Sequence, residues 1–303
     1  MNNEPVTTTN PALELNGHSM VSPLQRVMVC SPRTAGWDLP DRAARWQQLG
    51  FLHAPNFAVA QSQHEALCHE LAAAGAEIVE LPANPALSLD AVYTHDPSLA
   101  TDLGLIAMRP GKPNRVAEAA LHSSFIDSKG MTVLGAITTP GATEAGDIVW
   151  LDSKTLLVGL GFRTNQAGAQ QLREMLAPAS VKVLTASLPY GQGPAVCLHL
   201  MSFMSMLDDR TILVDLPFMS VETFHLLRDR GFKLIEIDPA ERDTLACNVL
   251  ALGNKRLLAI EENRNTNDRL RQAGFDVRTF PGAELCANGG GGPTCLTRPL
   301  LRA

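Results

Sequence analysis

Near the end of the chain, four consecutive glycines lead to a single cysteine in the stretch Asn288-Gly-Gly-Gly-Gly-Pro-Thr-Cys295. Glycines lose much conformational freedom on folding, so a run of them marks backbone that needs positive φ or a close approach. A thiol on such a loop becomes a nucleophile once an electropositive site favours its thiolate. The motif therefore predicts that Cys295 is a covalent catalyst. The alternative is a flexible tail that carries a buried cysteine.

The composition is that of a globular protein. The chain has 303 residues, of which 45% are hydrophobic and 18% are charged. This length fits one large domain or two modest ones. The net charge of −6 and the lack of a run of lysine or arginine argue against nucleic acid as a partner, because binding phosphates needs clustered positive charge.

The N-terminal stretch is polar and lacks the basic and apolar regions of a secretion signal. We expect a flexible segment over residues 1–22 and a single catalytic domain over residues 23–303. No window approaches 18 uninterrupted apolar residues, so no membrane partner is expected and the predicted location is the cytoplasm. The six cysteines are then expected to be reduced. His64, Cys68 and His69 do not form a four-ligand zinc pattern, and no metal is predicted.

A helix–strand unit recurs five times along the chain. In each copy a helix ends at a small residue and an extended apolar run follows. The helices are expected over residues 63–75, 116–130, 166–179, 221–231 and 267–274, and the strands over 76–82, 131–137, 181–184, 232–238 and 275–280. Such repetition indicates an α/β fold of five similar modules, which can be arranged around a pseudo-symmetry axis as blades are in a propeller.

One residue suited to chemistry follows each unit at a similar distance. Counting 14 to 21 residues from the helix ends reaches Asp96, Glu144, His199, Asn248 and Cys295. If the modules surround an axis, these equivalent positions converge on a single central site. His199 and Cys295 then form a proton carrier and a nucleophile. The carboxylates of Asp96 and Glu144 favour a planar cation such as a guanidinium.

Other segments offer candidates for the rest of the substrate site. Asp147 stands at the start of a predicted buried strand, where an acid needs a cationic partner. Arg115 and Arg163 lie in loops punctuated by glycine or proline and are suited to binding a substrate carboxylate. Phe51 and Leu52 precede the first repeated helix and are expected to form a lid, or alternatively a hydrophobic staple for that helix.

Together these motifs resemble those of the guanidine-modifying (pentein) superfamily, which comprises arginine deiminases, dimethylarginine dimethylaminohydrolases and amidinotransferases. The resemblance covers roughly residues 26–300 and rests on six segments in the family's order. They are Tyr93-Thr-His-Asp96-Pro97, Arg109-Pro-Gly-Lys-Pro-Asn-Arg115, Glu144-Ala-Gly-Asp147, Arg163-Thr-Asn165, Leu198-His199-Leu200 and Gly289-Gly-Gly-Gly-Pro-Thr-Cys295. The resemblance implies a five-bladed α/β propeller, the pentein fold, with no metal or organic cofactor.

The resemblance also implies a role for each central residue. Asp96 grips the guanidinium, Cys295 attacks its central carbon, and His199 protonates the departing amine. Glu144 helps to hold the cation and positions His199. Water then releases a ureido product from a covalent thiouronium intermediate. The implied substrate is arginine or an N-methylated arginine, and the products are citrulline and ammonia or an alkylamine.

One departure from the family's motifs bears on the substrate. Arginine deiminases usually carry His-x-Asp where this chain has His199-Leu-Met201, and dimethylaminohydrolases lack that second acid too. The resemblance therefore favours the dimethylaminohydrolase branch, and Met201 is compatible with N-methyl groups or with a core position. Two alternatives are amidino transfer to an amine acceptor and a non-catalytic pentein binding scaffold. The sequence leaves a homo-oligomer open.

Overall fold

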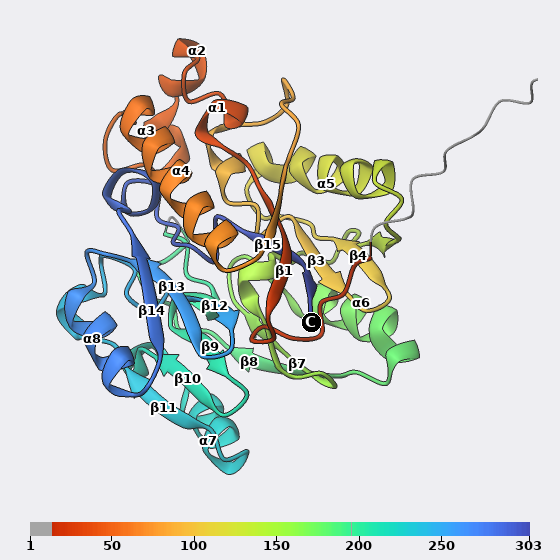
Figure 1. Ribbon diagram of the computed structural model, residues 1–303. Coiled ribbons are helices and arrows are strands. Elements are labelled where there is room, and N and C mark those ends of the chain that lie inside the picture. Colours follow the sequence, from red (N-terminus) through yellow and green to blue (C-terminus); the bar gives the residue numbers. More distant parts are fainter. Residues whose placement is uncertain (1–13, 195) are drawn as a thin grey trace, which may run out of the picture.

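The computed structural model describes residues 14–194 and 196–303, and this part of the chain forms five sheets of three strands (Figure 1). In every sheet the middle strand pairs antiparallel with the first strand and parallel with the last. The sheets, each from first to last strand, are β15 (Arg298–Arg302), β1 (Leu24–Val29) and β2 (Glu77–Glu80); β3 (Ser98–Thr101), β4 (Gly104–Ala107) and β5 (Val133–Ala136); β6 (Ile148–Asp152), β7 (Thr155–Leu160) and β8 (Lys182–Ser187); β9 (Met204–Asp208), β10 (Thr211–Val214) and β11 (Lys233–Glu236); and β12 (Leu250–Gly253), β13 (Arg256–Ile260) and β14 (Asp276–Phe280).

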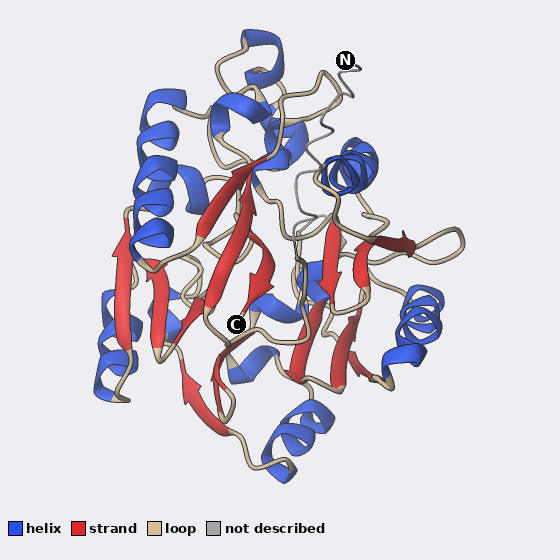
Figure 2. Cartoon of the chain, turned by 45° about the vertical axis from the view of Figure 1, so that its right-hand side comes forward, coloured by secondary structure: helices blue, strands red, loops and turns tan. Residues whose placement is uncertain are grey.

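A helix joins the middle strand to the last strand of each sheet, because parallel neighbours need a crossover connection. The crossover helices are α4 (Phe57–Ala73), α5 (Val116–Ser128), α6 (Gln166–Leu176), α7 (Val221–Asp229) and α8 (Arg264–Gln272). The first crossover also contains α1 (Pro32–Ala35), α2 (Pro40–Ala43) and α3 (Trp46–Leu49). Figure 2 shows the long helices around the outside of the strands.

Short helical turns occupy the connections between these elements. The 3₁₀ turns are η1 (Leu89–Val92), η2 (Pro113–Arg115), η3 (Ala145–Asp147), η4 (Ala177–Ala179), η5 (Leu200–Ser202), η6 (Leu216–Phe218) and η7 (Pro239–Glu241), and η8 (Ala283–Ala287) is a π-helical turn. Two of them, η3 and η5, come directly after Glu144 and His199, two of the predicted site residues. They therefore help to position these side chains.

The mixed α/β class and the five predicted helix–strand units are confirmed. Each of the five predicted helices is followed by a residue in the left-handed region, a conformation that strains most side chains and so favours glycine. These residues are Gly75 (φ 95°), Gly130 (φ 73°), Ser180 (φ 57°), Gly231 (φ 79°) and Gly274 (φ 93°). In the third unit Ser180 therefore takes this position, directly after the predicted helix end at Ala179.

The two ends of the described chain meet in one sheet, because β15 pairs with β1 (Figure 1). Of the segment predicted to be flexible, residues 1–13 lie outside the described residues. Its described part contacts the sheets: Asn16 donates from its backbone N–H to Leu300 O (2.9 Å), and the His18 N–H donates to Asp102 Oδ1 (3.3 Å). The expected domain boundary at residue 23 stays a prediction.

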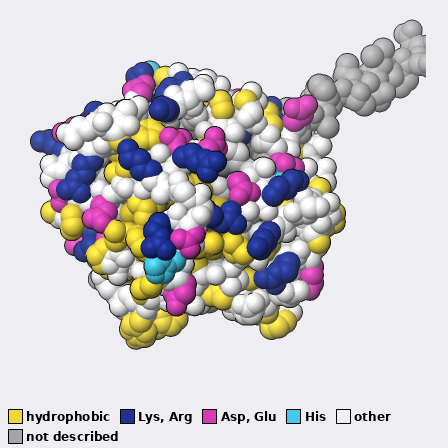
Figure 3. Space-filling view, turned by 90° about the horizontal axis from the view of Figure 1, so that it is seen from below, with side chains coloured by type: hydrophobic (Ala, Val, Ile, Leu, Met, Phe, Trp, Pro, Cys, Tyr) yellow, Lys and Arg dark blue, Asp and Glu magenta, His cyan; other side chains and the backbone are white. Residues whose placement is uncertain are grey.

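Four apolar clusters fill the space between the sheets and under the helices. The largest packs α4 against the first sheet, with Leu67, Leu71 and Val27 fully buried. Another packs the third sheet against the fourth through residues such as Leu157 and Ile212. On the face shown in Figure 3, side chains of both signs are interspersed with apolar ones. Among the described residues, none of the helices has the length and apolar character that crossing a bilayer requires.

Candidate active site

The thiol of Cys295 lies on the loop between η8 and β15 and is held by the loop before β12. Asn248 donates from its Nδ2 to Cys295 Sγ (3.0 Å) and accepts the Thr294 backbone N–H at Oδ1 (3.0 Å). The His95 backbone N–H donates to Cys295 O (3.1 Å), which ties the loop to the second sheet as well. The structure therefore gives Asn248 a positioning role, while contact with substrate stays a prediction.

The glycines before Cys295 are required by close packing. A Cβ on Gly291 would lie 2.5 Å from the ring of Tyr93, and one on Gly292 would lie 2.7 Å from Asn248 Cγ. Gly290 adopts a φ of 82°, which also favours glycine. The glycine run thus lets the thiol loop press against Tyr93 and Asn248.

The imidazole of His199 lies between two carboxylates and is buried. Its Nε2 is 2.6 Å from Glu144 Oε2, and its Nδ1 is 3.8 Å from Asp96 Oδ1. The Leu200 backbone N–H donates to Asp147 Oδ1 (3.0 Å), so Asp147 anchors the loop that carries the imidazole. Burial alone would lower the pKa of His199, but nearby Cys197, Asp147 and Asp96 raise it well above its usual value. His199 is therefore an imidazolium at neutral pH.

Glu144 is fully buried and accepts hydrogen bonds from three residues. Besides its bond to His199, its Oε1 accepts from the Gly111 N–H (2.8 Å) and from a terminal nitrogen of Arg163 (3.1 Å). Burial raises the pKa of Glu144, but the hydrogen bond from His199 and the charges of His199, Arg163 and Arg115 lower it well below its usual range. The carboxylate is therefore ionised and oriented.

Asp96 keeps one carboxylate oxygen unused. Arg115 donates to Oδ2 at 2.6 Å, whereas Oδ1 is buried and has no hydrogen-bond partner among the described residues. Burial raises the pKa of Asp96, but the charges of His199 and Arg115 lower it below its usual value. A Cβ on Gly146 would collide with the His199 imidazole and lie 2.9 Å from Asp96 Oδ1, so glycine lets the imidazole pack close to this carboxylate. An ionised oxygen without a partner is an acceptor for a guest's N–H.

Cys295 and His199 line one cavity of about 180 Å³, which we call the thiol cavity. Its wall also includes the residues Gly146, Cys197, Leu198, Met201, Phe203, Asp215, Phe218, Arg242, Leu245 and Asn248. Arg242 donates to both carboxylate oxygens of Asp215, and its guanidinium lies 5.0 Å from the ring centre of Phe218. Sequence reasoning missed this pair. The available signal was the position of Asp215 directly after the buried strand β10.

Arg115 and Arg163 do not line the thiol cavity, so their predicted binding of a substrate carboxylate finds no support in this arrangement. Arg115 donates to Glu118 Oε2, to Tyr93 O and to Asp96, which occupies its guanidinium. Arg163 donates to Glu144. The physical reason is electrostatic: buried carboxylates need counterions, and these two arginines supply them.

Phe51 and Leu52 also lie outside the cavity wall. Phe51 is 5% exposed and packs edge-on against Trp37, with ring centres 5.4 Å apart, so it is a core residue. Leu52 is 74% exposed, and its N–H donates to Asn288 O (2.9 Å) at the start of the glycine run. The segment thus contacts the thiol loop from outside, and a lid role stays a prediction.

Cys197 was not predicted as a site residue, yet it lies beside His199. It is exposed, and its Sγ lies 3.5 Å from His199 Nε2. Its place two residues before His199 was the signal that could have revealed it. Glu144, Cys197 and His199 each offer one atom within 4.8 Å of the others and so could hold a metal ion. Structural zinc sites use four protein ligands, one more than this set provides.

Most of the chain is similar to known proteins. The arginine deiminase family model matches residues 87–231 and 224–302. An uncharacterised protein of Bacillus subtilis, YkgA, is 25% identical over 280 residues, 92% of each chain. The dimethylarginine dimethylaminohydrolase of Streptomyces coelicolor is 29% identical over 245 residues, 79% of this chain and 85% of that protein.

Solved structures show the same fold. The DDAH of Pseudomonas aeruginosa, complexed with citrulline, superposes with a TM-score of 0.74 at 24% identity, and the match covers 93% of this chain and 100% of that one. The matched family model spans Asp96, Glu144, His199 and Cys295. This chain therefore belongs to the arginine deiminase family and, with it, to the guanidine-modifying (pentein) superfamily.

Proposed function

We propose that this protein is a cysteine-dependent hydrolase acting on the guanidinium carbon of arginine or an N-methylated arginine. The main support is that the Cys295 sulfur and the His199 imidazole line one cavity, while Asp96 and Glu144 lie against that imidazole. A guanidinium carbon is electrophilic when the group stays protonated and its charge is held in place. Asp96 does not line this cavity, but its negative charge, 3.8 Å from the His199 imidazole, would help to hold such a cation.

The substrate's own charge would activate the thiol. Burial and the charge of Asp96 raise the pKa of Cys295 to about 11, although His199 and the hydrogen bond from Asn248 lower it. The thiol is therefore protonated at neutral pH before substrate binds. A guanidinium beside the sulfur favours the thiolate and so lowers this pKa. The nucleophile then forms mainly in the substrate complex, and the thiol proton leaves to solvent because the His199 imidazolium is already protonated.

The reaction then needs two steps. The thiolate attacks the guanidinium carbon and forms a C–S bond, and the C–N bond to the departing amine breaks as the His199 imidazolium donates its proton to that nitrogen. The neutral imidazole, oriented by Glu144, next takes a proton from water. The resulting hydroxide attacks the same carbon, the C–S bond breaks, and a ureido product leaves.

The lining of the thiol cavity favours a methylated substrate. Leu198, Met201 and Phe203 contribute apolar surface to the lining of the thiol cavity. The position two residues after His199 carries Met201 and not an acid. Methyl groups on a guanidinium nitrogen gain from burial against such a surface, whereas an N–H would lose a hydrogen bond there. We therefore propose dimethylarginine as the better substrate, with citrulline and dimethylamine as products.

We also propose that the five sheets surround an axis as propeller blades do. The repeated topology of the sheets and the pairing of β15 with β1 support this arrangement, as does the likeness to the Pseudomonas aeruginosa fold. Loops that precede the first strand of each sheet would then meet at one place. The cytoplasmic location and the homo-oligomer stay predictions.

A substrate series tests the proposed function. Purified protein is incubated with arginine, monomethylarginine or dimethylarginine, and the ureido product is measured. We expect citrulline from at least one of them and the highest kcat/KM with dimethylarginine. No product from any of the three, with the Cys295 thiol intact by mass spectrometry, would contradict the proposal. If a glycine or lysine acceptor instead yields a new guanidino compound, the enzyme is an amidinotransferase.

A further inference from the structure

A second, smaller cavity borders the thiol cavity. It has a volume of about 40 Å³, and we call it the arginine cavity because Arg298 and Arg302 line it. His95, Met201 and Thr294 line both cavities and separate them. The arginine cavity is thus distinct from the site that holds the thiol.

Four buried polar atoms on the lining residues have no hydrogen-bond partner among the described residues. They are Trp150 Nε1, Thr294 Oγ1, Arg298 Nε and Arg302 Nε. The indole and guanidinium nitrogens can only donate, and the hydroxyl can donate as well. Buried donors without acceptors are rare in folded proteins, so this cluster needs an explanation. A guest that accepts hydrogen bonds would satisfy donors of this kind.

The two guanidinium groups also lack a counterion. Within the described ranges, neither Arg298 nor Arg302 forms an ion pair with a carboxylate. Their other nitrogens donate to backbone carbonyls, Arg298 to His95 O and Arg302 to Ser22 O and Ala251 O. Burial lowers the pKa of each arginine to about 9, so both remain charged at neutral pH.

Nearby groups do not neutralise this charge. Asp96 attracts Arg298 from the other side of His95, but the Asp96 carboxylate already pairs with Arg115 at 2.6 Å. His95 donates to Thr297 O through Nδ1, and burial lowers the pKa of His95 to about 3, so His95 is neutral. Two buried positive charges therefore face a small cavity rimmed by donors.

We propose that the arginine cavity binds a monoatomic inorganic anion of the chloride class. An anion beside these lining residues would offset the two guanidinium charges and could accept hydrogen bonds from donors that have no protein partner. A water molecule in its place would bring two further donors and no charge. The volume has room for such an ion with a water, because one water-sized probe needs about 10–15 Å³.

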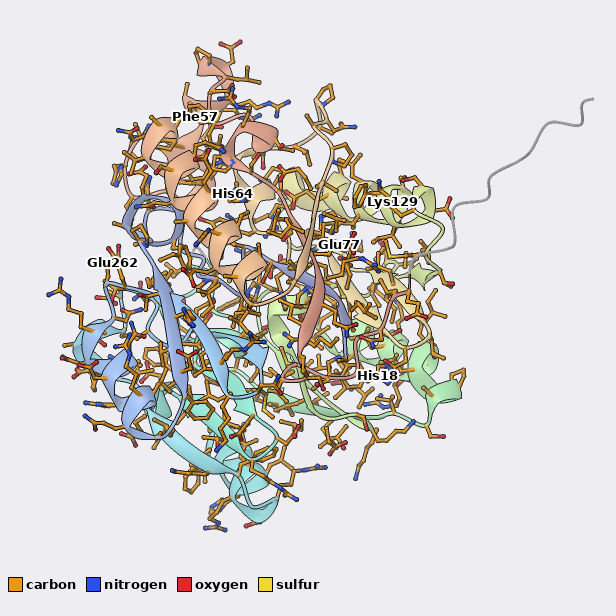
Figure 4. The ribbon with its side chains drawn as sticks, in the orientation of Figure 1. His18, Phe57, His64, Glu77, Lys129 and Glu262 are labelled. Atoms are coloured by element: carbon orange, nitrogen blue, oxygen red, sulfur yellow. The ribbon has the colours of Figure 1, made fainter. Side chains whose placement is uncertain are left out.

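The segment before β1 covers this cavity. Asn16 and Gly17 line it, and Asn16 forms two hydrogen bonds with the Arg302 backbone, at 2.7 and 2.8 Å. His18 stacks on Trp150 with ring centres 4.2 Å apart, and Figure 4 labels His18 on this segment. The anion would therefore fix β15, β6 and the N-terminal segment together, and its binding should stabilise the fold.

Thermal unfolding in matched salts tests the proposal. The protein is unfolded in sodium chloride and in sodium gluconate at equal ionic strength, and the midpoint is followed as chloride replaces gluconate. We expect a saturable rise of about 5 °C, since a ligand that binds only the folded state stabilises it by mass action. Sodium bromide should act like chloride. Equal midpoints in chloride and gluconate would overturn the proposal.

Variants separate this site from general salt effects. Trp150→Phe keeps an aromatic side chain and removes the Nε1 donor, so we expect half-saturation at a severalfold higher chloride concentration. Arg302→Met should abolish the chloride shift, whereas the exposed Arg278→Met should keep it. Should Arg302→Met fail to fold, Trp150→Phe decides the question. An unchanged chloride response in Trp150→Phe would overturn the proposal, whatever the catalytic assays show.

Discussion

The two cavities are neighbours, yet their charges are arranged in opposite ways. Near the thiol cavity the buried acids form ion pairs with basic side chains: Asp96 with Arg115, and Glu144 with Arg163 and His199. Around the arginine cavity the guanidinium groups donate to backbone carbonyls, and no carboxylate among the described residues pairs with them. We propose a cationic guest for the first region and an anionic guest for the second.

This difference shows that burial alone does not define the role of a charged residue. Arg115 and Arg302 are 4% and 5% exposed, and desolvation penalises both. Arg115 is stabilised by Glu118, Asp96 and Asp90, which raise its pKa well above its usual value. Arg302 has no such partner among the described residues. The presence or absence of a protein counterion therefore distinguishes a structural pair from the proposed anion site.

The largest expected effect is the loss of activity in Cys295→Ser, a change that should affect the thiol cavity and not the arginine cavity. Cys295→Ser should lower kcat/KM by at least about 10⁴-fold, because serine is a much weaker nucleophile without an adjacent strong base. The chloride response of unfolding should stay unchanged, since the arginine cavity keeps its donors. Cys68→Ser, a change within α4, is the matched control and should keep full activity. Residual activity above a hundredth of wild type in Cys295→Ser would show that another group is the nucleophile.

Unfolding of two arginine variants compares the regions directly. In chloride-free buffer Arg115→Met should cost about 3–5 kcal/mol, because it leaves Asp96 and Glu118 buried without a counterion. Arg302→Met should cost much less there, since it removes a charge that has no protein partner. Denaturant titration followed by circular dichroism measures both. Similar losses in the two variants would contradict the distinction.

A smaller effect is expected at Asn248, which positions the thiol. Asn248→Ala removes the hydrogen bond to Cys295 Sγ and the acceptor of the Thr294 N–H, so kcat/KM should fall on the order of 10²-fold. Asn248→Asp keeps the acceptor but adds a negative charge beside the sulfur, which should slow alkylation of Cys295 further. Steady-state kinetics and iodoacetamide labelling measure these effects. Wild-type kcat/KM in Asn248→Ala would rule out this positioning role.

The smallest effect concerns the pH dependence of the free thiol. The pKa of Cys295 is raised to about 11, so below that pH the thiolate fraction increases as pH rises. The rate of alkylation of Cys295 should therefore increase about tenfold per pH unit between pH 7 and 9. Peptide mass spectrometry separates this rate from those of the other cysteines. A rate that is already constant near pH 7 would mean that the thiolate exists without substrate.

The five modules could be predicted because their signals are local. Glycines at Gly75, Gly130, Gly231 and Gly274 mark left-handed residues after helices, and apolar runs follow each of them. The candidate site residues were predicted for a related reason. Each occupies the loop before the first strand of a sheet, so the repeat itself indicates equivalent positions. The interpretation of the glycine run before Cys295 as close-packed backbone also held, since it depends only on the size of the residues.

The partners of charged residues could not be predicted, because tertiary packing decides them. Arg115 and Arg163 looked like loop arginines free to bind a carboxylate, but the fold places buried acids beside both. No role was predicted for Arg298 and Arg302, which lie at the two ends of β15. They are buried because β1 and the segment before it close over them. Phe51 similarly became a core residue through its contact with Trp37.

The most direct test of the central claim is detection of a covalent adduct on Cys295. The protein is mixed with dimethylarginine, quenched in acid after milliseconds to seconds, and the peptide that contains Cys295 is weighed by mass spectrometry. We predict a thiouronium adduct on this cysteine that decays as citrulline appears, and longer persistence of the adduct in Glu144→Gln, where His199 is less well oriented. Citrulline formed at the wild-type rate without any adduct on Cys295, and equally in Cys295→Ser, would contradict the account.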